Sequence, residues 1–321
     1  MNKKIFSLRN LIHFVGIFIF IFIFILFKID IKKSLEIIAG SNPFLIIIAL
    51  VAGIPPIILR NLRWQKLLKN KGVIIKFSET FLVYFYAVFW GSITPGKIGE
   101  FSKIIYLNKK GVPLKISTVS VIFDRLFDII TILILGFLGL FIFFRNLKNI
   151  IYIFLIIGMI ILSFIFILYF NKNFIKNTLE KIISKLPIKN SSNVSEEIID
   201  NLFNSLKKPG FILFSGTIIS IAAWVMYFFQ LYILSKAIGI NLAFILTSAI
   251  IAIITTLNLI PITVSGIGTR DLTLMLLFSQ IGLGKEEAIS FSMMILLTFV
   301  AGGLFGWICG FFLEKHPPQM S

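Results

Sequence analysis

The sequence predicts an all-α protein that forms a polytopic bundle of helices in a membrane. Hydrophobic residues make up 58% of the 321 residues and the mean hydropathy is +0.99, well above the values of ordinary soluble chains. Several apolar runs are long enough to cross a bilayer, and basic residues lie between them. The runs are Leu11–Phe27, Pro43–Leu59, Ser117–Phe144, Ile150–Phe170, Phe211–Leu234, Leu242–Ile262 and Ala288–Leu313, with a further apolar stretch at Phe81–Ile93.

The first run has two interpretations. Lys3, Lys4 and Arg9 precede it, as basic residues precede the apolar core of a signal peptide. No small-x-small cleavage pattern follows the run, so we expect an uncleaved membrane anchor. Residues 1–321 are then expected to form a single transmembrane domain.

The distribution of lysine and arginine decides between two topologies. If all eight apolar stretches cross, the cytoplasmic side holds 13 basic residues and the other side 17, against the positive-inside rule. If residues 81–99 and 242–268 each enter and return as hairpins, the counts become 22 and 8. We therefore predict about six full spans plus two re-entrant hairpins, with both termini cytoplasmic in the plasma membrane.

The two predicted hairpins resemble each other in sequence. Thr94–Gly99 and Thr263–Gly268 share a threonine, an isoleucine four residues on and a glycine five residues on. In the predicted topology the hairpins enter from opposite sides, as in the inverted repeats of many transporters. The alternative is coincidence, since glycine is common wherever a helix stops.

Residues 171–210 form the longest polar segment. Their apolar residues recur at helical spacing on either side of Pro187, which predicts two amphipathic helices on the cytoplasmic membrane surface. A solvated helical linker without lipid contact is the alternative.

The composition also excludes several classes of site. The single cysteine, Cys309, excludes disulfides and thiolate metal sites, and two histidines at opposite ends of the chain argue against a histidine metal site. No phosphate-binding loop of the G-x-x-x-x-G-K-[ST] type occurs. The basic residues flank apolar runs, which fits anionic lipid headgroups and not nucleic acid. We expect no metal and no cofactor.

Three charged residues inside an apolar run are the strongest indication of function. Asp124, Arg125 and Asp128 lie within Ser117–Phe144, and each unpaired charge near the centre of a membrane helix costs about 2.5–3.5 kcal/mol. The two aspartates share a helix face, and Arg125 can reach one of them. We expect a polar pathway or headgroup site; an internal ion pair that locks helices together is the alternative.

The hairpin tips supply the remaining candidate residues. Pro95 removes a backbone donor and glycines permit tight turns, so broken helices can turn backbone amides toward a cavity. The candidates at the tips are Pro95, Gly96, Lys97, Gly99 and Glu100 in the first hairpin and Gly266, Gly268, Arg270 and Asp271 in the second.

In the last apolar run, Gly302, Gly306 and Gly310 form a face that permits close helix contact. Packing within the monomer is expected over a dimer interface.

Together these motifs resemble the transmembrane region of lysylphosphatidylglycerol synthases. The resemblance covers nearly the whole chain and rests on Leu62-Arg63-Trp64 with Leu67-Leu68, Pro95–Glu100, Asp124–Asp128 and Ser265–Asp271. It implies a flippase-type domain that moves lipids between leaflets. Two departures are conservative in charge: Asp124 and Asp271 stand where glutamate is common in the family. No soluble aminoacyltransferase domain follows Leu313, so the synthetic activity of the family is not expected.

We therefore expect translocation of a phosphate-bearing lipid, such as a phospholipid or a polyprenyl-phosphate lipid, rather than enzymatic activity. Arg125 would attract the phosphate; Asp124, Asp128 and Glu100 would orient Arg125 or accept a cationic or hydroxylated headgroup. Lys97, Arg270 and Asp271 would control access. The alternatives are an intramembrane lipid transferase and a non-catalytic partner of a separate glycosyltransferase or aminoacyltransferase.

Overall fold

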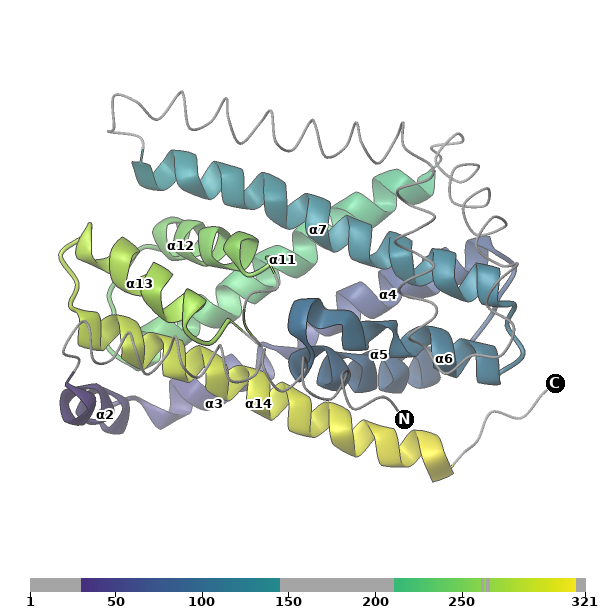
Figure 1. Ribbon diagram of the computed structural model, residues 1–321, viewed down its shortest axis with the longest axis horizontal. Helices are drawn as coiled ribbons and strands as arrows, with labels where there is room; N and C mark the ends of the chain where they lie inside the picture. Colours follow the sequence, from purple (N-terminus) through teal and green to yellow (C-terminus); the bar gives the residue numbers. More distant parts are fainter. Residues whose placement is uncertain (1–29, 145–210, 261–262, 264–265, 316–321) are drawn as a thin grey trace, which may run out of the picture.

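The computed structural model describes residues 30–144, 211–260, 263 and 266–315, and it contains no strand within these ranges (Figure 1). The all-α prediction is therefore confirmed. The expected spans Leu11–Phe27 and Ile150–Phe170 and the polar segment 171–210 lie outside the described residues. The helices are α2 (Ile31–Ala39), α3 (Pro43–Val51), α4 (Ile54–Asn70), α5 (Phe77–Ser92), the 3-10 helix η1 (Pro95–Phe101), α6 (Ser102–Lys109), α7 (Leu114–Phe144), α11 (Phe211–Ala237), α12 (Phe244–Leu257), α13 (Thr269–Ser279) and α14 (Lys285–Lys315).

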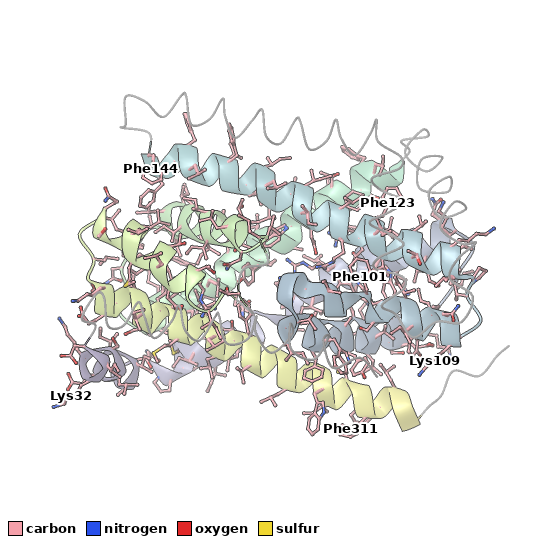
Figure 2. All side chains as sticks on the ribbon, viewed as in Figure 1. Lys32, Phe101, Lys109, Phe123, Phe144 and Phe311 are labelled. Atoms are coloured by element: carbon pink, nitrogen blue, oxygen red, sulfur yellow. The ribbon has the colours of Figure 1, made fainter. Side chains whose placement is uncertain are left out.

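Four long apolar segments of this bundle match four of the six predicted spans. α7 has 31 residues, so at 1.5 Å per residue it exceeds the hydrocarbon thickness of about 30 Å. The long helices expose large apolar side chains on their outer faces, as expected for contact with lipid; Figure 2 shows Phe311 of α14 pointing away from the bundle. The segments are Pro43–Asn70 (α3 with α4), Leu114–Phe144, Leu213–Ala237 and Lys285–Leu313.

Local sequence explains where the first helices begin. The Asn42 side chain accepts hydrogen bonds from the amides of Phe44 and Leu45, and Pro43 occupies the first turn, where its missing amide hydrogen costs nothing. The chain breaks between α3 and α4 at Ala52 and Gly53, just before two prolines open α4. The apolar segment is therefore two helices in succession.

The segment 81–99, predicted to form the first hairpin, covers most of α5 and the start of η1; the returning helix α6 lies beyond its predicted end. The Tyr106 hydroxyl near the end of α6 donates to Glu79 Oε1 in the first turn of α5 at 2.7 Å, and Lys110 forms an ion pair with the same carboxylate. The chain thus returns to the level at which α5 began. Between the two helices, Thr94 Oγ1 accepts a 2.8 Å hydrogen bond from the Gly99 amide and closes the turn.

Gly99 is required in this hairpin by contact and not by a left-handed backbone. A Cβ atom at position 99 would lie 2.1 Å from the carbonyl oxygen of Trp90, so η1 packs backbone to backbone on α5. The left-handed residue of the turn is Lys97, at φ 56°, the one non-glycine residue with positive φ in the described part of the chain.

The segment 242–268, predicted to form the second hairpin, contains α12, and the returning helix α13 begins just after it at Thr269. The turn between α12 and α13 resembles the first turn. Thr263 Oγ1 lies 3.0 Å from Thr269 Oγ1, so a threonine at the start of each motif again bonds to a residue shortly after it. Gly266 and Gly268 adopt φ angles of 76° and 89°, which side chains disfavour.

The long helices α7 and α14 each pack mainly on the hairpin that they do not directly follow in the chain. α7 follows the first hairpin and packs mainly on α12 of the second, while α14 follows the second hairpin and packs mainly on α5 of the first. Figure 1 shows the hairpins in opposite halves of the molecule, both between α7 and α14. A pair of repeats related by a two-fold axis produces this exchange.

Glycines on the long helices make both contacts close. A Cβ at Gly306 of α14 would lie 2.3 Å from the carbonyl oxygen of Phe85, and a Cβ at Gly139 of α7 would lie 2.7 Å from that of Ala249. Gly310 likewise abuts Tyr86, so this glycine face packs within the monomer, as expected. Gly302 has open space and takes no part.

Two apolar clusters flank the centre of the bundle. One contains Trp224 and the interior faces of α11 to α14, and the other contains Trp64 and Tyr84 with side chains of α4, α5 and α6. α4 borders both clusters, because its Trp64 belongs to the second and its Arg60 lies over the Trp224 ring of the first.

The hairpin geometry predicts which residues share a membrane face. A cysteine at Asn108 is expected to react with an impermeant maleimide from the same side as one at Asn70, because α6 returns to the start of α5. A cysteine at Lys32 serves as the opposite control, since Lys32 and Lys109 lie at opposite ends of the bundle (Figure 2). Labelling of Asn108 and Asn70 from different sides would contradict the hairpin.

Paired glycine substitutions test the exchanged packing. Gly306→Ala is expected to lower the midpoint of thermal unfolding in detergent, because the new methyl group meets the α5 backbone. Gly302→Ala, on the same helix, is expected to leave the midpoint unchanged or to raise it, since alanine favours a helix by about 1 kcal/mol over glycine. Equal effects of the two substitutions would refute the close contact.

Candidate functional site

Asp124 on α7 lies at the centre of a buried cluster of charges. Its Oδ1 accepts hydrogen bonds from Nε and Nη2 of Arg63 at 2.9 and 2.6 Å, and its Oδ2 accepts from Lys103 Nζ at 2.6 Å and from the Tyr84 hydroxyl at 3.0 Å. The side chains of Asp124 and Lys103 are 0% exposed and that of Arg63 is 1% exposed. One carboxylate therefore joins α4, α5, α6 and α7.

Asp128, one turn further along α7, is held by three arginines. Arg63 Nη1 donates to Oδ1 at 2.8 Å, and Arg125 Nη2 donates to Oδ2 at 2.9 Å. Arg60 Nε lies 3.5 Å from Oδ1. Arg63 also donates to the Ser220 hydroxyl, which brings α11 into the cluster.

Arg125 connects the charged helix to the first hairpin. Its Nη1 donates to Glu100 Oε1 at 2.9 Å, and its Nη2 lies 2.5 Å from Oε2 of the same carboxylate. The expectation that Arg125 reaches one aspartate is met by Asp128; Asp124 is held instead by Arg63 and Lys103. The Arg125 side chain is 14% exposed, so it lies at the edge of the cluster.

Aromatic rings replace part of the water that these cations would otherwise bind. The Lys103 ammonium lies 4.1 Å from the Tyr84 ring centroid, and the Arg60 guanidinium lies 4.8 Å from the Trp224 ring centroid. Such cation–π contacts contribute up to about 2 kcal/mol each when water is excluded. Together with the ion pair to Asp124, the Tyr84 contact explains how Lys103 tolerates complete burial.

Two cations lie on the accessible side of the cluster. The Arg60 side chain is 16% exposed, and Lys97 in η1 is an exposed residue. Lys97 lies three residues before Glu100 in the same short helix η1, and Glu100 is bonded to Arg125. Lys97 thus belongs to the same electrostatic neighbourhood although it forms no ion pair with a described residue.

The second hairpin places its charged residues in a separate contact. Arg270 Nε donates to Ser292 Oγ at 2.6 Å, Ser292 donates to Asp271, and the Gly268 amide donates to Asp271 Oδ2 at 2.6 Å. Arg270 is 3% exposed and Asp271 is 2% exposed. They follow the hairpin turn, as expected, but they are buried and fasten the start of α13 to α14.

Sequence reasoning missed the strongest partners of Asp124. By the positive-inside pattern, Arg60 and Arg63 are basic residues that flank a span, whereas Arg63 lies fully inside the bundle. Lys103 was counted among the cytoplasmic basic residues. The one available signal for Arg63 was its place in the Leu62-Arg63-Trp64 motif, because no local spacing links it to a residue 61 positions away.

No group of three or more histidine, cysteine or acidic side chains that could hold a metal occurs among the described residues. The carboxylates of Asp124, Asp128 and Glu100 instead face cationic side chains. The arrangement is suited to binding an anion at its edge, next to Arg60, Lys97 and Arg125.

Comparison with known proteins gives a family match. Residues 13–306 match the family described as lysylphosphatidylglycerol synthase TM region. A UPF0104 membrane protein of Methanocaldococcus jannaschii is 24% identical over 310 residues, covering 90% of each chain. A UPF0104 membrane protein of Methanothermobacter thermautotrophicus is 24% identical over 310 residues, covering 89% of this chain and 88% of the relative. No solved structure matches the chain significantly.

Removing Arg63 tests the cohesion of the cluster. Arg63→Met is expected to destabilise the protein by about 3–5 kcal/mol, because it removes the bridge between two buried carboxylates. Thermal unfolding of the purified protein in detergent measures the loss. Lys66→Met, at an exposed position of the same helix, is the matched control and is expected to have little effect.

A second substitution separates lost charge balance from lost packing. Adding Asp128→Asn to Arg63→Met is expected to recover part of the stability, because Asp124 keeps Lys103 and Glu100 keeps Arg125. Arg63→Met as stable as Lys66→Met would contradict the structural role of the cluster.

Proposed function

Since the chain belongs to the lysylphosphatidylglycerol synthase transmembrane-region family, we propose that it moves a phosphate-bearing lipid between the two leaflets of its membrane. The ion cluster is where the headgroup binds during this movement. The observation that carries the proposal is the position of Arg125 and Arg60, which lie at the accessible edge of charges otherwise closed to solvent.

A purely structural ion pair does not need such an edge. The inner part of the cluster, Asp124 with Arg63 and Lys103, is complete without a ligand and holds four helices together. Arg125 adds a further cation, whose side chain is 14% exposed, and the adjoining hairpin turn holds Lys97 at a positive φ, which is unfavourable for a residue other than glycine. Ionisable groups inside a membrane domain usually mark a substrate path.

Each residue then has a distinct role. Arg125 binds the phosphate, and Glu100 and Asp128 orient its guanidinium from two sides. Asp124 fixes Arg63, which in turn positions Asp128. Arg270 and Asp271 hold the second hairpin on α14 and so set its position.

The lipid moves passively or down a gradient, since the sequence contains no nucleotide-binding loop. We place the protein in the plasma membrane with both termini in the cytoplasm, on the basis of the basic-residue distribution. The hydrophobic tails remain in the bilayer next to the exposed apolar faces of the long helices.

Reconstitution tests the proposal. Liposomes that contain the pure protein and a fluorescent anionic phospholipid or polyprenyl phosphate are expected to lose inner-leaflet fluorescence to an impermeant quencher, without added ATP. The recovered lipid is expected to be chemically unchanged. Conversion of the lipid would support an intramembrane transferase instead. Absence of movement with every headgroup would favour a membrane partner of a separate glycosyltransferase or aminoacyltransferase.

The geometry of Arg125 predicts the effect of a conservative change. Arg125→Lys is expected to slow lipid movement about tenfold, because an ammonium lacks the planar set of donors with which Arg125 holds Glu100 and Asp128 and still offers Nε to a phosphate. Lys66→Arg on α4 is the matched control at an exposed site and is expected to keep the wild-type rate. A wild-type rate in Arg125→Lys, with unchanged expression, would remove Arg125 from the lipid path.

A further inference from the structure

The charges of the cluster do not balance. Five cationic side chains share it with three carboxylates, which leaves a formal excess of two positive charges among the described residues. Arg270 and Asp271, in their separate contact, contribute one charge of each sign and so do not alter this excess. The cations are Arg60, Arg63, Lys97, Lys103 and Arg125, and the carboxylates are Glu100, Asp124 and Asp128.

The distances show which cations are in excess. Lys103 is paired with Asp124, Arg63 with both aspartates, and Arg125 with Glu100, all at 2.9 Å or less. Arg60 Nε lies 3.5 Å from Asp128, an oxygen that Arg63 already occupies, and makes no hydrogen bond. Lys97 forms no ion pair with a described residue. Arg60, whose ion pair with Asp128 is the longest of the cluster, and Lys97, which has none with a described residue, are therefore the two cations in excess of the carboxylates.

Unused hydrogen-bond donors accompany the excess charge. Nε of Arg60, Nε of Arg125 and the indole Nε1 of Trp224 are buried and have no hydrogen-bond partner in the described part of the chain. A buried donor without an acceptor costs about 1–3 kcal/mol. Arg60 lies over the Trp224 ring, and Arg60 and Arg125 both pair with Asp128, so the three residues with unused donors belong to one contact network.

We infer that the site binds a phosphate monoester with two negative charges. A monoester phosphate carries about −1.5 to −2 charges at neutral pH and offers three terminal acceptor oxygens, whereas a phosphodiester carries a single charge. The monoester matches both the excess charge and the unused donors next to Arg60, Lys97 and Arg125. This inference rests on the proposed function and names its substrate class: lipids that end in a phosphate monoester.

The experiment compares short-chain lipids that differ only in headgroup. Dioctanoyl phosphatidic acid, phosphatidylglycerol and phosphatidylcholine are titrated against the full-length protein in neutral detergent, and binding is measured by native mass spectrometry. Phosphatidic acid is expected to bind at least tenfold more tightly than phosphatidylglycerol, because a second charge-assisted interaction is worth a factor of ten or more. Equal affinities would overturn the inference.

Free phosphate compounds distinguish a lipid ligand from a soluble one. Inorganic phosphate and glycerol 3-phosphate are expected to bind more weakly than phosphatidic acid, since they lack the tails that bury apolar surface. Binding as tight as that of phosphatidic acid would assign the site to a soluble phosphate and overturn its assignment to a lipid.

Two substitutions connect the selectivity to the excess charges. Lys97→Gln and Arg60→Gln each remove one uncompensated cation, so each is expected to reduce the preference for phosphatidic acid over phosphatidylglycerol about tenfold. Lys97 is exposed, so its substitution is expected to leave folding intact even where Arg60→Gln does not. Lys66→Gln is the matched control and is expected to retain the wild-type preference. Unchanged selectivity in Lys97→Gln and Arg60→Gln would contradict the inference.

The test also separates this inference from the proposed function. Movement of all anionic lipids at one rate, with equal binding, would leave translocation standing and overturn the headgroup class. Selective binding of phosphatidic acid without movement of any lipid would sustain the headgroup class and overturn translocation.

Discussion

The carboxylate of Asp124, closed to solvent and bonded to Arg63, Lys103 and Tyr84, is the interaction on which the bundle depends. Helices in a membrane gain little from burying apolar side chains against each other, because lipid tails are equally apolar. Close glycine contacts and charged hydrogen bonds therefore carry much of the specificity of packing. A buried charge left without its partners costs several kcal/mol, so the cluster strongly favours one relative position of α4, α5, α6 and α7.

The hairpins and long helices give this cluster an accessible edge. The first hairpin turns at η1, directly beside the charged part of α7, and presents Glu100 and Lys97 there. The second hairpin makes the corresponding contact between the start of α13 and Ser292 of α14, but with buried and balanced charges. Each hairpin thus packs on the long helix that follows the other hairpin, and in this respect the two halves are alike. The excess positive charge, however, lies next to the first hairpin only. The proposed binding of an anionic headgroup depends on this asymmetry.

The sequence was sufficient for the helical class, for the four long apolar segments of the described residues and for the placement of Asp124, Arg125 and Asp128 within one of them. Each of these depends on local patterns: apolar run length, or charges within such a run. The partners of Asp124 were not predictable in this way. Arg63 and Lys103 lie 61 and 21 residues from it, and basic residues near the end of an apolar run fit the positive-inside pattern equally well. Arg63 and Lys103 come together with Asp124 only in the folded chain. The excess of cations over carboxylates in the cluster can therefore be determined only from the structure. The contact of Gly139 with Ala249 was missed for the same reason.

The central claim is that a phosphate group completes the charge balance at the accessible edge of the cluster. A cryo-electron microscopy structure of the protein with bound dioctanoyl phosphatidic acid tests it most directly. The account predicts phosphate density within hydrogen-bond distance of the guanidinium groups of Arg60 and Arg125, with the Lys97 ammonium turned toward it. Phosphate density at Arg270, or only at basic residues on the membrane surface, with Arg60 and Lys97 left without an anion, would contradict it.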